Sequence, residues 1–177
     1  MSIKILLEWL SHRLADLAGL ILLVMMLHVT ADVAMKYLFN NPIEGTLEIV
    51  AYYYMVGAVF LPLGLVEYLR SSISVELFFE RFPKAMKIGV MGFVMAACAV
   101  FYGGFAWVTW GDALKAMAKG EIVMGPIDVV IWPTRFLLPI GFFMAALMCL
   151  WHLLRLIFGG DAARAELTSH VDQIEEA

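Results

Sequence analysis

Four long apolar stretches, separated by shorter polar segments, dominate the pattern along the chain. They cover residues 14–35, 49–69, 88–110 and 136–158. Each is close to the roughly 20 residues that a helix needs to cross a bilayer core about 30 Å thick. Since unpaired backbone groups are prohibitively costly in lipid, each stretch is expected to be a helix. The pattern predicts an all-α integral membrane protein, with one four-helix bundle at residues 1–160 and a polar tail at 161–177.

Composition and charge agree with this prediction and orient the bundle. Hydrophobic residues make up 63% of the chain, charged residues 16%, and the mean hydropathy is +0.86, whereas soluble domains carry about 25% charged residues. Eight of the 12 Lys and Arg residues fall on the side that holds both termini. Cytoplasmic segments carry the excess of these residues, so both termini and the tail are expected in the cytoplasm. No basic patch suggests nucleic-acid binding.

Two further features are expected to modify the simple spans. Residues 3–13 and 75–82 mix apolar and charged side chains, which is typical of short helices that lie in the membrane interface. Pro62 and Pro139 interrupt the second and fourth spans. Because proline removes a backbone hydrogen bond inside a helix, kinks are expected at both positions.

Ionisable side chains within the spans are the first candidates for function in a membrane protein. Asp16 and Glu67 fall near the expected cytoplasmic ends, within reach of water. Asp32 is spaced to pair with Lys36 on one helical face. The third span has no acidic or basic side chain between Ile88 and Trp110. With no mid-membrane carboxylate and no catalytic or phosphate-binding motif, neither enzymatic activity nor independent transport is expected.

His28 and His152 are the candidates for a bis-histidine haem, as in membrane anchors of redox enzymes. At 1.5 Å per residue, His28 lies roughly 22 Å from the inner edge of the membrane and His152 only about 9 Å. Because two axial ligands need the same depth, His28 is instead expected to face the bundle as a hydrogen-bonding group. Cys98 and Cys149 lie in apolar runs without metal-site spacing and are expected to pack as small apolar residues.

The connection between the first two spans lies in the stretch KYLFNNPIEGTLEIVAYYYM at residues 36–55 and is expected on the extracytoplasmic side. Asn40 and Pro42 form a turn signal, because asparagine tolerates unusual backbone angles and proline suits the first turn of the following helix. Thr46 is expected to cap the start of the second span. The stretch therefore predicts a short turn between two helices.

Glu44 and Glu48 in this stretch are weighed as catalytic, ion-binding or structural groups. The positive end of a helix dipole stabilises anions near the first turn by about 0.3–1 kcal/mol, so both acids suit this position without any chemistry. Lys36, at the end of the first span, is expected to bond to Glu48 or Glu44 and to fasten the two helices at the outer membrane edge. Contact of these residues with another subunit is the alternative.

The segment between the third and fourth spans, at residues 111–135, is the longest on the outer side and the natural surface for an external partner. Its charges have both signs, and complementary charges across an interface fix the orientation of a partner. The candidates are Asp112, Lys115, Lys119, Glu121 and Asp128. A merely solvated loop is the alternative.

Three stretches resemble the small membrane subunit, of the DctQ type, of tripartite ATP-independent periplasmic (TRAP) transporters. They are K-Y-L-F-N-N-P at 36–42, T-L-E at 46–48 and S-I-S-V-E-L-F-F-E-R-F-P at 72–83. The last contains a cytoplasmic loop motif made of Ser72, Val75, Glu76 and Pro83. With the order and spacing of the four spans, the resemblance covers nearly the whole chain.

The chain departs from the family pattern at three positions. Lys36 stands where the family often has arginine, Leu47 where it has a second acid, and Ser72 where it has histidine. Lysine keeps the charge but loses the bidentate geometry of arginine, so its pairing with Glu48 is expected to be weaker. Ser72 puts in doubt any role that needs an imidazole in this loop.

The resemblance implies an accessory subunit. In such transporters a large membrane subunit (DctM type) moves substrate with sodium by an elevator motion, and a periplasmic protein (DctP type) captures the substrate, an organic acid or similar small solute. The small subunit is then expected to sit in the bacterial inner membrane as a scaffold beside the large subunit. It would add docking surface for the binding protein and hold no cofactor of its own. The alternatives are a haem- or quinone-associated anchor of a respiratory enzyme and a small self-contained transporter.

Overall fold

The computed structural model describes residues 3–69 and 84–159. Within these residues, four segments are long and apolar enough to cross a membrane, which confirms the four predicted spans. The first is α1 (Ile3–Phe39) and the third is α5 (Lys84–Lys119). The second consists of α2 (Thr46–Ile49), the π-helical turn η1 (Val50–Tyr54), α3 (Met55–Phe60) and α4 (Leu63–Tyr68). The short strands β1 (Ile122–Val123) and β2 (Val129–Val130) precede the fourth, which is made of the 3-10 turn η3 (Thr134–Phe136) and α6 (Leu137–Phe158).

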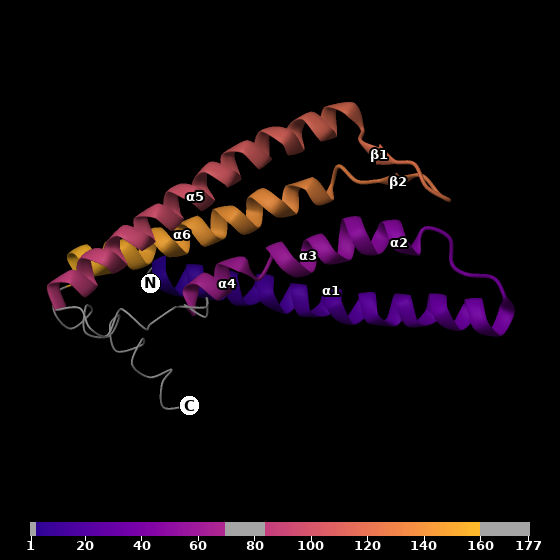
Figure 1. The fold of residues 1–177 in the computed structure, drawn as a ribbon, viewed down its shortest axis with the longest axis horizontal. Helices are drawn as coiled ribbons and strands as arrows, with labels where there is room; N and C mark the ends of the chain where they lie inside the picture. The colour runs from indigo at the N-terminus through magenta and orange to yellow at the C-terminus, as the bar shows by residue number, and fades with distance from the viewer. Residues whose placement is uncertain (1–2, 70–83, 160–177) are drawn as a thin grey trace.

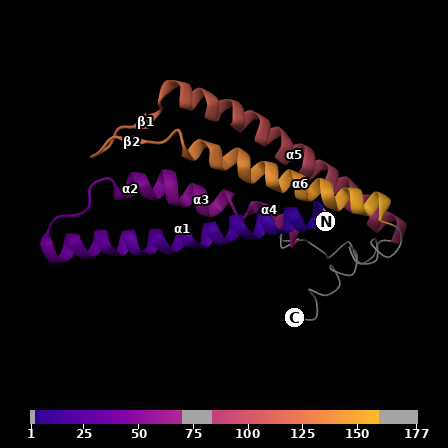
Figure 2. The ribbon, with the colours of Figure 1, turned by 180° about the vertical axis from the view of Figure 1, so that it is seen from behind.

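The spans are arranged as two pairs (Figure 1). α5 and α6 run side by side, and α1 runs beside the segments of span two, as both views show (Figures 1 and 2). α6 joins the pairs because it also packs against α3 and α4. The pairs separate towards the end that carries the α1–α2 turn (40–45) and the β1–β2 hairpin (122–130), which we name the hairpin end.

The buried core follows the inner face of α6. Ala145 and Met148 are fully buried, and Met144 and Cys149 are only 4% exposed. Gly141 lets α6 approach span two closely, because a side chain at this position would collide with the carbonyl of Phe60. Close helix approach through small residues is the usual way in which helices pack in a membrane.

The two prolines behave differently. Span two is broken at Pro62, as expected, since α3 ends at Phe60 and α4 begins at Leu63. The kink expected at Pro139 is wrong, because Pro139 lies in the first turn of α6, which continues as one helix to Phe158. The N–H groups of a first turn have no partner within the helix, so proline is tolerated there.

α1 and α5 are longer than the predicted spans. α1 begins at Ile3, so residues 3–13 are its first turns and not a separate interfacial helix. α5 continues past Trp110 to Lys119, which places three charges expected in the outer loop on its last turns. These turns consist mainly of Ala, Leu, Lys and Met, which favour a helix, and Ala113 and Ala116 bury their small side chains.

Gly120 ends α5 with a left-handed backbone, at φ 60°. The N–H of Gly120 donates to the carbonyl of Met117 at 3.1 Å, and the N–H of Glu121 donates to the carbonyl of Ala116 at 3.0 Å. This pair of bonds satisfies carbonyls that would otherwise be unpaired at the end of a helix. The chain then turns directly into β1.

Several predictions of the sequence fall on residues that the structure does not describe. They are the interfacial helix at 75–82, the loop motif of Ser72, Val75, Glu76 and Pro83, and the polar tail at 161–177. The cytoplasmic position of both termini also stays a prediction.

Candidate functional site at the hairpin end

The α1–α2 turn begins at Asn40, which has the left-handed backbone (φ 51°) that asparagine tolerates. The carboxylate of Asp32 accepts a hydrogen bond from the N–H of Ile43 at 2.6 Å. Asp32 therefore holds the returning chain against α1. Pro42 lies in the turn, four residues before Thr46, and not in the first helical turn as expected.

The ion pairs expected for Lys36 are absent. Among the described residues, exposed Lys36 forms no ion pair with Asp32, Glu44 or Glu48. Asp32 instead accepts the N–H of Ile43, and Glu48 is out of reach because the two helices are offset. His28 of α1 lies beside Thr46, the first residue of α2, so Lys36, eight residues further along α1, lies about 12 Å beyond the start of α2. Contact of Lys36 with another subunit stays a prediction.

His28 links α1 to two points of span two. Its Nδ1 lies 3.1 Å from the hydroxyl of Tyr54, and its Nε2 lies 3.5 Å from that of Thr46. Thr46 donates its own hydroxyl proton to the carbonyl of Ile43 at 3.0 Å and does not cap the helix; Gly45 occupies the cap position. Since Thr46 uses its proton elsewhere, His28 Nε2 is the donor to Thr46, and Nδ1 accepts from Tyr54. The predicted hydrogen-bonding role of His28 is confirmed.

His152 lies far from His28, as the depth estimate predicts. Its ring contacts Tyr68 at the last residue of α4, with ring centroids 6.3 Å apart, whereas the ring of His28 contacts Tyr54 at 5.8 Å. Tyr54 and Tyr68 are separated by α3 and α4. The two histidines are therefore not placed to share one iron.

The β1–β2 hairpin sits on the start of span two. Its strands pair antiparallel, with Ile122 opposite Val130 and Val123 opposite Val129. The hydroxyl of Tyr53 donates to the carbonyl of Val130, which ties β2 to η1. This hairpin was not predicted, although the sequence contains a signal for it: two pairs of β-branched residues flank a Gly-Pro turn.

Two glycines allow the hairpin and span two to approach. A side chain at Gly45, in the α1–α2 turn, would collide with the side chain of Ile127. A side chain at Gly125, in the hairpin, would collide with the carboxylate of Glu48. Glu48 lies in the first turn of α2, as predicted, but it faces the hairpin and not Lys36. Glu44, in the turn before the helix, is exposed. The α1–α2 turn and the hairpin thus form one continuous surface, which we name the hairpin face (40–48 and 121–130).

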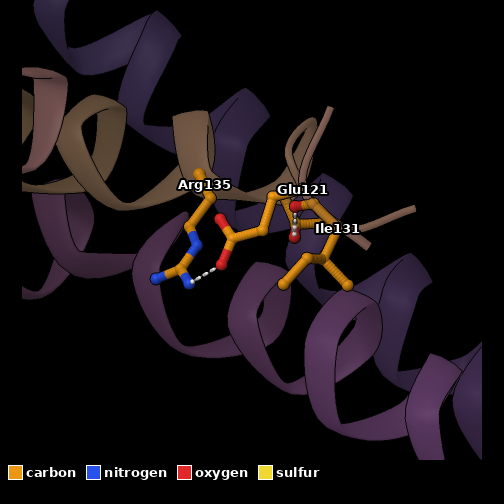
Figure 3. A network of polar contacts seen from close by, with 4 residues as sticks. Glu121, Ile131 and Arg135 are labelled. Atoms are coloured by element: carbon orange, nitrogen blue, oxygen red, sulfur yellow. Dashed lines mark hydrogen bonds and ion pairs between the residues drawn. The ribbon is translucent and has the colours of Figure 1, made fainter. Parts of the chain in front are cut away.

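The base of the hairpin is closed by polar contacts (Figure 3). Arg135 pairs with the carboxylate of Glu121 at 2.8 Å, and the N–H of Ile131 donates to the Glu121 carbonyl at 3.0 Å. Both charged side chains are partly exposed, so the pair contributes about 0.2–1 kcal/mol. Its main effect is to hold Glu121, the residue before the hairpin, against η3, which follows the hairpin in the chain.

The five predicted docking charges therefore differ in their surroundings. Asp112 and Lys115 pair with each other at 3.0 Å along α5, and Glu121 is held by Arg135. Lys119 and Asp128 are exposed and form no ion pair within the described residues. These two charges are the ones that the fold leaves available to a partner.

Two other helices surround Glu67. Half-buried and one residue before the end of α4, it lies beside Tyr102, near the middle of α5, and Cys149, within α6. Its position near a water-accessible end of span two stays a prediction. The hydroxyl of Tyr102 donates to Glu67 Oε1 at 2.7 Å, and the thiol of Cys149 donates to Oε2 at 3.5 Å. Cys149 therefore acts as a hydrogen-bond donor as well as a small packing residue. The last residue of α4, Tyr68, contacts the rings of His12 in α1 and His152 in α6.

Comparison with known proteins supports the resemblance noted in the sequence. A family model described as "Tripartite ATP-independent periplasmic transporters, DctQ component" matches residues 25–159, from within α1 to the end of α6. No curated protein and no solved structure matches the chain. Because the family match covers most of the chain, including span two and the hairpin, the chain belongs to the DctQ family of tripartite ATP-independent periplasmic transporter components.

Proposed function

We propose that this chain is the small, non-transporting membrane subunit of a sodium-coupled TRAP transporter for an organic acid or similar small solute. It acts as a scaffold for a large elevator-type subunit (DctM type) in the bacterial inner membrane. Its hairpin face forms part of the docking surface for a periplasmic substrate-binding protein (DctP type). Membership of the DctQ family carries this proposal, because that family supplies one component of a three-component transporter.

The scaffold role is supported by the surface of the spans. The small residues Gly141 and Ala145 are used inside the bundle, whereas side chains added at Gly103 and Gly104 of α5 would meet nothing within 4 Å. Gly103 lines an apolar groove of about 930 Å³ between α1, α5 and α6. Small residues with open space beside them permit close approach of a helix from another subunit or of lipid.

The docking role is supported by the way the hairpin is held. The hairpin is held at three points, namely the bond from Tyr53, the contact of Ile127 with Gly45 and the Glu121–Arg135 pair. A fixed surface loses little conformational entropy when a partner binds. Lys119 and Asp128 provide the exposed charges of opposite sign that would orient this partner.

Copurification and reconstitution test the proposed function. Affinity purification of the chain in mild detergent is expected to recover a much larger polytopic membrane protein. Proteoliposomes that hold the chain alone are expected to show no uptake, whereas the two membrane subunits with the binding protein and a sodium gradient should accumulate substrate. Uptake by the chain alone would favour a self-contained transporter, and a haem absorbance band would favour a respiratory anchor; either result contradicts the proposal.

A further inference from the structure

Glu67 is an acidic side chain to which the proposed function gives no role, and it contacts two other helices. Tyr102 belongs to the apolar part of α5, where acidic and basic side chains are absent between Ile88 and Trp110. The ring of Tyr102 stacks on Phe142 of α6, with centroids 6.2 Å apart. Within the described residues Glu67 forms no ion pair. A half-buried carboxylate among apolar helices is costly unless its oxygen atoms are hydrogen-bonded.

The two oxygen atoms of Glu67 are each engaged by a different helix. Oε1 accepts the hydroxyl proton of Tyr102 from α5, and Oε2 accepts the thiol proton of Cys149 from α6. These two bonds connect α4 to α5 and α6 through one side chain, as a structural role requires. Each carboxylate oxygen has two lone pairs, so an experiment must separate this role from an ion site.

The position of Glu67 in span two explains why such a role is needed. α4 has only six residues and is separated from α3 by the break at Pro62. A helix this short gains little stability from its own backbone hydrogen bonds and depends on tertiary contacts. α4 packs against α1 and α6, and Glu67 adds directional bonds to α5 and α6.

We propose that Glu67 is a positioning residue that forms a polar joint between α4, α5 and α6 and locks the inner part of the broken span two. Its consequence for transport rests on the proposed function, since a rigid small subunit is required only if that subunit is a scaffold. Hydrogen bonds across helices hold a fixed register because each has a short range and a preferred direction. The joint itself is a property of this chain alone.

Melting of the purified full-length chain in detergent tests the joint. Glu67→Leu and Tyr102→Phe are each expected to lower the apparent melting temperature, Glu67→Leu by about 3–12 °C. Glu67→Gln should lower the apparent melting temperature by less than half as much as Glu67→Leu, because its amide oxygen still accepts the hydroxyl proton of Tyr102. The double variant Glu67→Leu/Tyr102→Phe should lower the melting temperature by less than the sum of the decreases in the two single variants, because both substitutions remove the same hydrogen bond. Tyr37→Phe, at an 81% exposed tyrosine, is the matched control and should melt like the parent.

Uptake by the assembled transporter separates the joint from an ion or proton site. Glu67→Gln should retain uptake if Glu67 is a joint, whereas loss of uptake with unchanged melting would show that its charge or proton is used and would overturn the proposal. Parent-like melting of both Glu67→Leu and Tyr102→Phe would overturn it as well. If Glu67→Leu does not fold, the Glu67→Gln and Tyr102→Phe comparisons still decide. Failure of the parent chain to support uptake would count against the proposed function only, since the melting comparison needs no partner.

Discussion

Gly45 and Gly120 show how single residues shape the hairpin end, and Gly19 within α1 serves as a comparison. Gly45 has φ 79° and is packed against Ile127, whereas Gly120 has φ 60° with nothing within 4 Å of its missing side chain. Gly19, inside α1, also meets nothing but has ordinary helical geometry. A left-handed backbone costs a residue with a side chain about 1–2 kcal/mol. An added side chain would therefore meet neither backbone strain nor a neighbour at Gly19, backbone strain alone at Gly120, and both at Gly45.

Alanine at these three glycines should affect stability in a fixed order. Gly19→Ala is expected to be neutral or stabilising, because alanine favours a helix over glycine by about 1 kcal/mol. Gly120→Ala should destabilise by about 1–2 kcal/mol from strain alone, and Gly45→Ala by more, since it also displaces Ile127. The apparent melting temperature in detergent measures the order. Adding Ile127→Ala to Gly45→Ala should remove the excess, and an unchanged excess would contradict the assigned contact.

Span two is the element on which the hairpin end is built. Consecutive tyrosines of the π-helical turn η1 reach different neighbours: Tyr53 bonds to the hairpin and Tyr54 bonds to His28 of α1. π-helical turns within α-helices often occur at functional positions. η1 therefore connects the hairpin to α1, although the two helix pairs separate at this end (Figure 2).

Removing one hydroxyl from η1 should loosen the hairpin. Tyr53→Phe deletes the bond to the Val130 carbonyl, and one hydrogen bond of about 1 kcal/mol corresponds to roughly fivefold faster opening. Hydrogen exchange of the peptide that covers residues 121–131 is the measurement. Tyr52→Phe is the matched control, because Tyr52 makes no side-chain hydrogen bond within the described residues. Equal exchange in both variants would show that Tyr53 does not hold the hairpin.

The whole molecule is asymmetric along its length. α1 has 37 residues and α5 has 36, which correspond to about 55 Å of helix, whereas α6 has 22 residues, or about 33 Å. α6 and span two, which has 23 residues from Thr46 to Tyr68, come close to a bilayer core of about 30 Å, whereas α1 and α5 must tilt or protrude. The last turns of α5 carry Asp112, Lys115 and Lys119 together with the hairpin. We infer that this end stands out from the apolar core, where a soluble partner can reach it.

Charge reversal at Lys119 should therefore weaken docking without disturbing the membrane complex. In the reconstituted transporter, Lys119→Glu is expected to raise the concentration of binding protein needed for half-maximal uptake severalfold, with unchanged yield of the purified complex. This effect should decrease at high salt, because salt screens exposed charges beyond about 10 Å. Arg13→Glu, at the opposite end of α1, is the control. Unchanged dependence on binding protein in Lys119→Glu would remove Lys119 from the docking surface.

Much of the fold could be predicted from local pattern. The four spans, the break at Pro62, the left-handed Asn40 and the hydrogen-bonding role of His28 all follow from residue type, length or depth. Pairings between helices could not be predicted in the same way. Lys36 misses Glu48 because α1 extends beyond α2, and Glu67 meets Tyr102 because α4 ends level with the middle of α5.

The sequence by itself determined four stretches long and apolar enough to cross a membrane, all of which are helices in the described part of the chain, because a helix pairs its own backbone groups where lipid offers no partners. It also carried the signals of the DctQ family, which depend on residue order alone. The tertiary structure alone decided which polar groups meet. Consecutive residues of a helix differ by 1.5 Å along its axis and by about 100° around it. A shift of one helix by one residue would therefore change which side chains face each other. Contacts such as Glu48 with Gly125 and Glu67 with Tyr102 thus depend on how the packed elements are offset.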